Sequence, residues 1–319
     1  MKRRRGDTNM SHQVETMAYA GEVPWHGLGT KVPADLTPEQ MLQAAGLDWE
    51  VNKVDLTYGD GLIVPGKKGL VRSSDGAYLD TIGDDWNPLQ NSEAFEFFND
   101  FVMAGDMEMH TAGSLEDGRR TWALAKIKDA VFEIVKDDIT ECYLLFSNPH
   151  KYGMSITVMM TPIRVVCNNT ITMALNGASE HMVKINHRSE FDADAVKETL
   201  GVAKDKLDTY KEAAQFLSTK NYTKDSIVEY FNEVFPFTAN KRDNDMSRNT
   251  KLAMEVLDTQ PGAEYGRGTF WQAFNTVTYL TDHELGRSND TRLTSAWFGA
   301  NRKKKIVALE KAIEFAEAA

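Results

Sequence analysis

The sequence predicts an α+β fold, an antiparallel sheet of hairpins packed with helices and followed by a mostly helical C-terminal part. Up to about residue 190, short runs of strand-forming residues alternate with Asp-Gly and Asn-Pro turn signals. From residue 191 on, the spacing of Ala, Leu, Glu and Lys is helical. We therefore expect an α+β core over residues 13–190. Residues 191–319 form either a separate domain or an oligomerisation part of the same domain.

Composition excludes several classes of protein. The chain has 319 residues, 42% of them hydrophobic, which is enough for a substantial core. Cys142 and Cys167 are the two cysteines and no hydrophobic signal sequence precedes the core, so we expect a reducing, cytoplasmic setting and no membrane association. Residues 1–12 begin with a basic run and are expected to be a disordered leader. A net charge of −11 argues against a generally basic nucleic-acid binder, yet it leaves room for a local basic groove.

The N-terminal third predicts a loop, a short helix and a set of strands. Residues 22–30 (EVPWHGLGT) combine two glycines and a proline, so we expect a loop in which Trp25 either anchors an N-terminal arm or lines a pocket together with His26. Thr37-Pro38 begins a helix to about Ala45. Residues 49–82 give strand-like runs with a hairpin turn at 74–76.

The middle of the chain predicts a helix and two further hairpins. Asn91 or Ser92 caps a helix running to about Met103. One hairpin covers residues 107–127 with Asp117-Gly118 at its tip, and the next covers residues 139–160. An antiparallel sheet of this kind can keep one face open to solvent or ligand.

Met154 to Leu175 is the longest apolar segment. Thr161-Pro162 fits a helix start, whereas the β-branched residues that follow favour a strand. We expect a helix over 163–175, because Arg164, Asn168, Ile171 and Leu175 recur at three- and four-residue steps. Residues 181–189 alternate like a strand with Lys184 on the polar face. The helices expected after residue 191 cover 192–218, 224–233, 247–257, 269–283 and 302–317.

The chain carries no catalytic signature. Neither cysteine stands in a nucleophile motif, the seven histidines include no pair at metal-binding helical spacing, and no phosphate-binding loop is present. We therefore expect no enzyme activity, no cofactor and no metal.

Basic and aromatic residues between 119 and 188 suggest a binding surface instead. Basic groups that follow phosphates beside rings that stack on bases are what a single-strand DNA binder needs. The candidates are Arg119, Arg120, Trp122, Arg164, Asn168, Lys184, His187 and Arg188. In the alternative interpretation, Trp122 belongs to the core, Arg164 forms a salt bridge and the others are solvated.

Several strings resemble a known family. They are Pro24 to Thr30, Pro88 to Asn91, Ala112 to Ser114 with Gly118 to Ala125, Thr161 to Thr170, Trp271, and Phe298-Gly299. Together they resemble the uncharacterised phage/plasmid-like protein family, a domain of unknown function, over roughly residues 15–315. The resemblance implies a mobile-element protein in a bacterial cytoplasm, and it brings no catalytic residue with it. A weaker architectural likeness is to phage single-strand annealing proteins such as the lambda Red beta group.

The leading hypothesis is a non-enzymatic phage or plasmid protein that binds single-stranded DNA. It would oligomerise with copies of itself through the helical region and act in recombination or replication. One alternative is a structural or host-interaction module, whose open sheet or Trp25 arm binds a protein partner. Another is an enzyme that uses His26 and Arg164.

Overall fold

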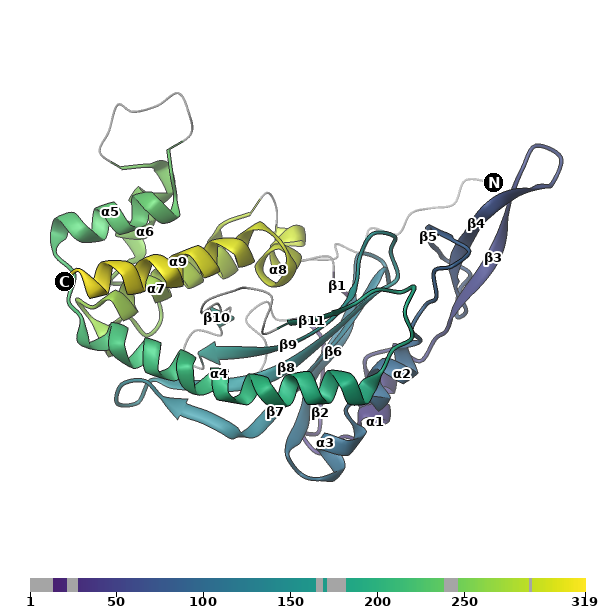
Figure 1. The fold of residues 1–319 in the computed structure, drawn as a ribbon, viewed down its shortest axis with the longest axis horizontal. Coiled ribbons are helices and arrows are strands. Elements are labelled where there is room, and N and C mark those ends of the chain that lie inside the picture. The colour runs from purple at the N-terminus through teal and green to yellow at the C-terminus, as the bar shows by residue number, and fades with distance from the viewer. Residues whose placement is uncertain (1–13, 22–27, 165–168, 171–181, 238–245, 287–288) are drawn as a thin grey trace.

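The computed structural model describes residues 14–21, 28–164, 169–170, 182–237, 246–286 and 289–319. It confirms the predicted α+β class (Figure 1). The large sheet has the strand order β10-β9-β8-β7-β6-β1-β2, and β11 also pairs with β9. Its ladders are antiparallel except for the parallel pair of β1 and β2. The strands are β1 (Val14–Ala20), β2 (Thr30–Val32), β6 (Met107–Leu115), β7 (Arg120–Glu133), β8 (Ile139–Pro149), β9 (Ile156–Arg164), β10 (Asn169–Thr170) and β11 (Met182–Ile185).

A second, three-stranded sheet forms an arm that projects from the body of the molecule (Figure 1). It consists of β3 (Val51–Tyr58), β4 (Leu62–Arg72) and β5 (Tyr78–Gly83) in that order. Its base is held by a cluster that includes Trp49, Trp86 and Leu70. Towards the tip the side chains are exposed, among them Tyr58 and Leu62.

Helices cover both faces of the large sheet. Directly opposite residues in an antiparallel ladder share a face, which places Trp122, Ser147, Thr157 and Lys184 in one row. On this face α8 (Asn289–Phe298) packs with Leu293 and Trp297, so we call it the α8 face. The opposite face packs against α1 (Pro38–Ala44), α2 (Asn91–Glu96), α3 (Asn99–Met103) and the start of α4 (Ala193–Thr219). The sheet face expected to be open is therefore covered by α8 around Trp122.

The helical region packs against the far ends of β7 and β8. Ala130, Ile134 and Cys142 of this part of the sheet join one core cluster with Tyr230 and Trp271 of the helices. The remaining helices are α5 (Lys224–Val234), α6 (Arg248–Val256), α7 (Phe270–Tyr279) and α9 (Ala300–Glu317). Shorter turns are η2 (Ala263–Gly266) and the π-helical η3 (Leu280–Glu284).

The prediction of a helix from residue 163 is wrong at its start. β9 continues to Arg164, with Thr140 opposite Arg164 and Cys142 opposite Pro162. Pairing with β8 therefore outweighs the Thr-Pro helix signal, in agreement with the β-branched content. Pro162 falls between the β11 and β10 pairings on the outer edge of β9, an edge position of the kind where a strand tolerates proline. The rest of that predicted helix is Asn169 and Thr170 in β10 and residues outside the described part.

Other differences are smaller. β1 and β2 flank the expected loop at residues 22–30, whose residues 22–27 lie outside the described part. The helix expected to end near Met103 is divided into α2 and α3, and its N-cap is Gln90. Helix α8 was not predicted.

Candidate anion-binding site

The predicted binding residues do not converge on one exposed face. Arg120, Trp122 and Lys184 share the α8 face of the sheet, but Trp122 is 2% exposed. Its indole packs edge to face on Trp297, with ring centroids 5.1 Å apart. A ring held in this way has no free surface on which a base could stack. The alternative interpretation of Trp122 as a core residue is the one that the structure supports.

Arg164 is buried in an ion pair. Its Nε and Nη2 donate to the carboxylate of Asp138 at 2.6 and 2.9 Å, and Nη2 also donates to the carbonyl of Gly262 at 2.8 Å. The side chains of Arg164 and Asp138 are 1% and 0% exposed. Trp271 of α7 donates its indole N–H to the same carboxylate at 2.8 Å. Arg164 therefore joins the sheet to the helical region and is out of reach of a nucleic acid.

His187 and Arg188 lie near the base of the arm. The His187 ring is buried and stacks on Trp86 with centroids 4.0 Å apart, and burial lowers the pKa of His187 to about 4. It is therefore neutral near pH 7 and offers no positive charge to a phosphate. Arg188 is exposed and paired with Asp85 at 2.9 Å. Asn168, Trp25 and His26 lie outside the described residues.

Arg120 differs from Arg164 because, among the described residues, no carboxylate forms an ion pair with it. It is 5% exposed; Nη1 donates to Ser147 Oγ at 3.2 Å and Nη2 to Met154 Sδ at 2.9 Å, while Nε finds no hydrogen-bond acceptor in the described part of the chain. The Phe298 ring lies over the guanidinium, 4.3 Å from it. Burial lowers the pKa of Arg120 below its usual value, because the charge is taken out of water, and the nearby charge of Glu116 offsets only part of this effect.

Arg120 lines a pocket of about 820 Å³, here called the Arg120 pocket. The pocket lies between the start of β7 and the junction of α8 and α9. Its lining residues are mainly polar or small, with Phe298 and Lys304 among them. The lining residues are Glu116, Arg120, Met154, Asn249, Leu285, Gly286, Thr291, Thr294, Ser295, Phe298, Gly299, Ala300, Asn301 and Lys304.

The positive end of a helix also faces this pocket. Helix α9 has 18 residues, and Gly299, Ala300 and Asn301 at its start line the pocket. Gly299 in the N-cap position provides no side chain, and Ser295 Oγ accepts the backbone N–H of Asn301 at 3.3 Å. A helix N-terminus carries about half a positive charge and binds anions. The acidic Glu116 in the wall is already paired with Lys151, at 3.0 Å.

The basic residues at 302–305 lie in different environments in the structure. Lys304 reaches the pocket and Lys303 is exposed. Lys305 is fully buried and paired with Asp282 at 2.7 Å. The sequence showed this run, and Phe298-Gly299, but nothing in it indicated that they meet Arg120.

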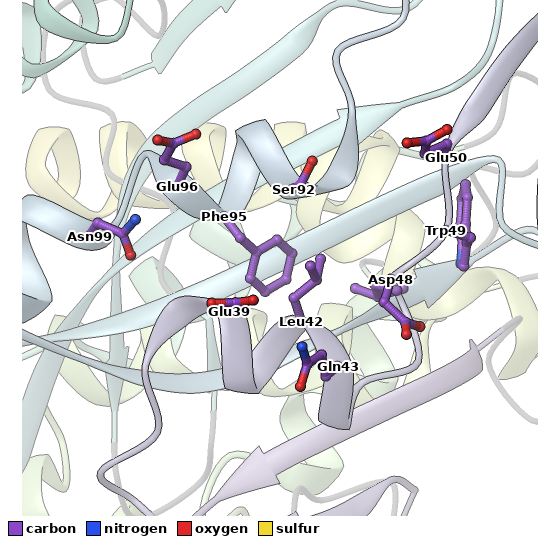
Figure 2. Close-up of a pocket in the computed structure, with 11 residues that line it drawn as sticks. Glu39, Leu42, Gln43, Asp48, Trp49, Glu50, Ser92, Phe95, Glu96 and Asn99 are labelled. Atoms are coloured by element: carbon purple, nitrogen blue, oxygen red, sulfur yellow. The ribbon is translucent and has the colours of Figure 1, made fainter.

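A second hollow has the opposite electrostatic character. It encloses about 460 Å³ between α1, α2 and the start of the arm. Figure 2 shows the carboxylates of Glu39, Asp48 and Glu96 around the apolar side chains of Leu42 and Phe95. A cavity with this lining repels phosphate, so it is not the anion site.

The described residues offer neither a metal centre nor a membrane span. In that part of the chain, no group of three or more His, Cys, Asp or Glu side chains is placed to hold a metal ion. Within the same residues, no helix has the length and apolar character needed to cross a membrane.

The fold and the pocket define an α+β protein with a candidate site for an anion. A family model described as "Domain of unknown function (DUF932)" matches residues 78–297, and the chain belongs to this family. The predicted membership of an uncharacterised family is thereby confirmed. No curated protein and no solved structure matched the chain.

Proposed function

We propose that this protein binds single-stranded DNA by taking a backbone phosphate into the Arg120 pocket. The observation that carries the proposal is the buried guanidinium of Arg120, which forms no ion pair with a carboxylate of the described residues. A buried charge that no carboxylate contacts directly costs several kcal/mol; Glu116 attracts Arg120 only at longer range and is itself paired with Lys151, so a bound phosphate would supply the missing direct partner. The N-terminus of α9 and Lys304 add positive potential at the same place.

A strand is a better fit than an isolated inorganic anion. The pocket is of the size that holds a small organic ligand. It sets the Phe298 ring beside its cationic groups, and a nucleotide presents a flat base beside a phosphate. The net charge of −11 opposes a polyanion at long range, so the proposal is a contact confined to a few phosphates and not a wide basic groove. Recombination or replication of a mobile element remains the proposed setting.

Fluorescence anisotropy with a labelled single-stranded oligonucleotide tests the proposal. The wild type should bind at about 50 mM salt, and binding should weaken steeply as salt is raised. Lys304→Ala should reduce the salt slope by about one, the effect of one lost phosphate contact. Arg120→Met should abolish binding. Lys303→Ala is the matched control, since Lys303 is exposed on the same turn of α9 but does not line the pocket.

Two results would overturn the proposal. One is the absence of binding at micromolar protein and low salt. The other is wild-type affinity in both Lys304→Ala and Arg120→Met, provided that circular dichroism shows both variants folded. Competition by inorganic phosphate without any binding of the oligonucleotide would retain an anion site but reject DNA as its ligand.

A further inference from the structure

The arm offers a free sheet edge. In the order β3-β4-β5, strand β3 pairs with β4 on one side, and no described strand pairs with its other side. The second edge strand of this sheet, β5, is tied to the body by one side-chain contact, in which the carboxylate of Asp80 accepts a hydrogen bond from the backbone N–H of Tyr152. An unpaired edge of eight residues is a template for a further strand.

The sequence of β3 is complementary to itself in the antiparallel direction. When Val54 is placed opposite Val54 of a second copy, Lys53 of each chain falls opposite Asp55 of the other. Opposite residues lie on the same face of a sheet, so this register forms two Lys–Asp pairs related by the two-fold axis. A two-fold interface requires this kind of self-complementarity.

The two faces of the arm support the same register. Val54 and Tyr78 are 37% and 54% exposed, and together with Leu56 they surround Gly69, which leaves an apolar patch next to the β3 edge. On the other face Asp55 is paired with Lys68, whose ladder partner it is. A second copy would extend the apolar patch through its own Val54 and set its Lys53 on the free side of Asp55.

We propose that the protein forms a two-fold dimer in which the β3 strands of two copies pair antiparallel about Val54, giving a continuous six-stranded sheet. The occupant of the edge is a second copy of this chain, because the charge pattern fits its own reverse. This interface does not involve the Arg120 pocket, so it stands or falls separately from the proposed DNA binding. It also differs from oligomerisation through the C-terminal helices, which the sequence suggested.

Charge reversal with mixing tests the charge pairs. In a dimer of Lys53→Asp, both cross-strand pairs between residues 53 and 55 become Asp opposite Asp, and in a dimer of Asp55→Lys both become Lys opposite Lys. The dimerisation affinity of each variant should therefore be at least about tenfold weaker than that of the wild type. Mixed in equal amounts, the two variants restore both opposite-charge pairs and should recover a dimer. Light scattering after gel filtration measures the mass. Lys136→Asp, exposed in the β7–β8 turn, is the control and should dimerise as the wild type does.

Cross-linking tests the register. Val54→Cys places two thiols opposite each other at the two-fold axis and should form an intermolecular disulfide under mild oxidation. Asn52→Cys, exposed on the same strand, faces Leu56 in this register and should not. The wild type reports any background from its native cysteines. A monomeric wild type at high protein concentration, unchanged dimers in both charge variants, or equal cross-linking of the two cysteine variants would overturn the proposal.

Discussion

Removing the carboxylate of Asp138 should destabilise the fold severely. Asp138→Ala deletes two guanidinium hydrogen bonds of 2.6 and 2.9 Å and the 2.8 Å bond from Trp271, at a site where Arg164 is 1% exposed. Breaking a buried pair by removing one partner costs about 3–5 kcal/mol, because it leaves an uncompensated charge. At about 4 kcal/mol, the ratio of folded to unfolded protein falls roughly a thousandfold.

Urea denaturation measures this loss. With a denaturant slope of about 3 kcal/mol per molar, the midpoint should fall by roughly 1 M. Trp271 lies against the pair, so its fluorescence and the far-ultraviolet circular dichroism should report the change together. The double variant Asp138→Leu with Arg164→Met removes both charges and should recover most of the loss, because apolar side chains replace a buried pair at little cost. A loss below about 1 kcal/mol in Asp138→Ala would show that the pair behaves like an exposed one and would refute the argument.

Three further predictions concern other parts of the molecule. Burial lowers the pKa of His187 to about 4 and that of His150 to about 3, below the unfolded value of about 6.5. Their neutral forms therefore stabilise the fold above about pH 6.5, and this stability is lost as pH falls from there through the folded pKa values. The urea midpoint should decrease over that window, and it should decrease less in His187→Phe, which keeps a stacking ring. Gly113→Ala would drive a methyl group into the carbonyl of Thr16 on β1, which should lower stability by about 1–3 kcal/mol in the same assay. Arg120→Met removes a buried charge that no carboxylate of the described residues contacts directly, so its melting temperature should equal or exceed that of the wild type while oligonucleotide binding is lost. A drop comparable to that of Asp138→Ala would contradict this interpretation.

Local chemistry made much of the fold predictable. The Thr37-Pro38 start predicted α1, which has a capping box between Thr37 and Gln40. The Asp117-Gly118 step predicted the β6–β7 turn, where both residues have positive φ. These signals act within a few residues, so a single sequence displays them fully.

Contacts between residues far apart in the sequence limited what could be predicted from the sequence. The run after Thr161 carried a helical spacing and a strand-like composition at once, and only the pairing of Thr140 with Arg164 decides between them. Helix α8 has the same difficulty. Its apolar residues Leu293 and Trp297 matter because they pack on Trp122, which is remote in the sequence.

Two arginines show why the candidate site could not be assigned from sequence. Arg120 and Arg164 both stand in strands of the large sheet, and both are nearly fully buried. They differ in what lies opposite: Arg164 meets Asp138, which precedes β8, whereas Arg120 meets Ser147, Met154 and the Phe298 ring. The Arg164–Asp138 ion pair is neutral as a whole and stabilises the fold. The Arg120 arrangement is open to an anion that the described residues do not supply, and that difference, set by residues far away along the chain, is what points to Arg120 as the place for a ligand.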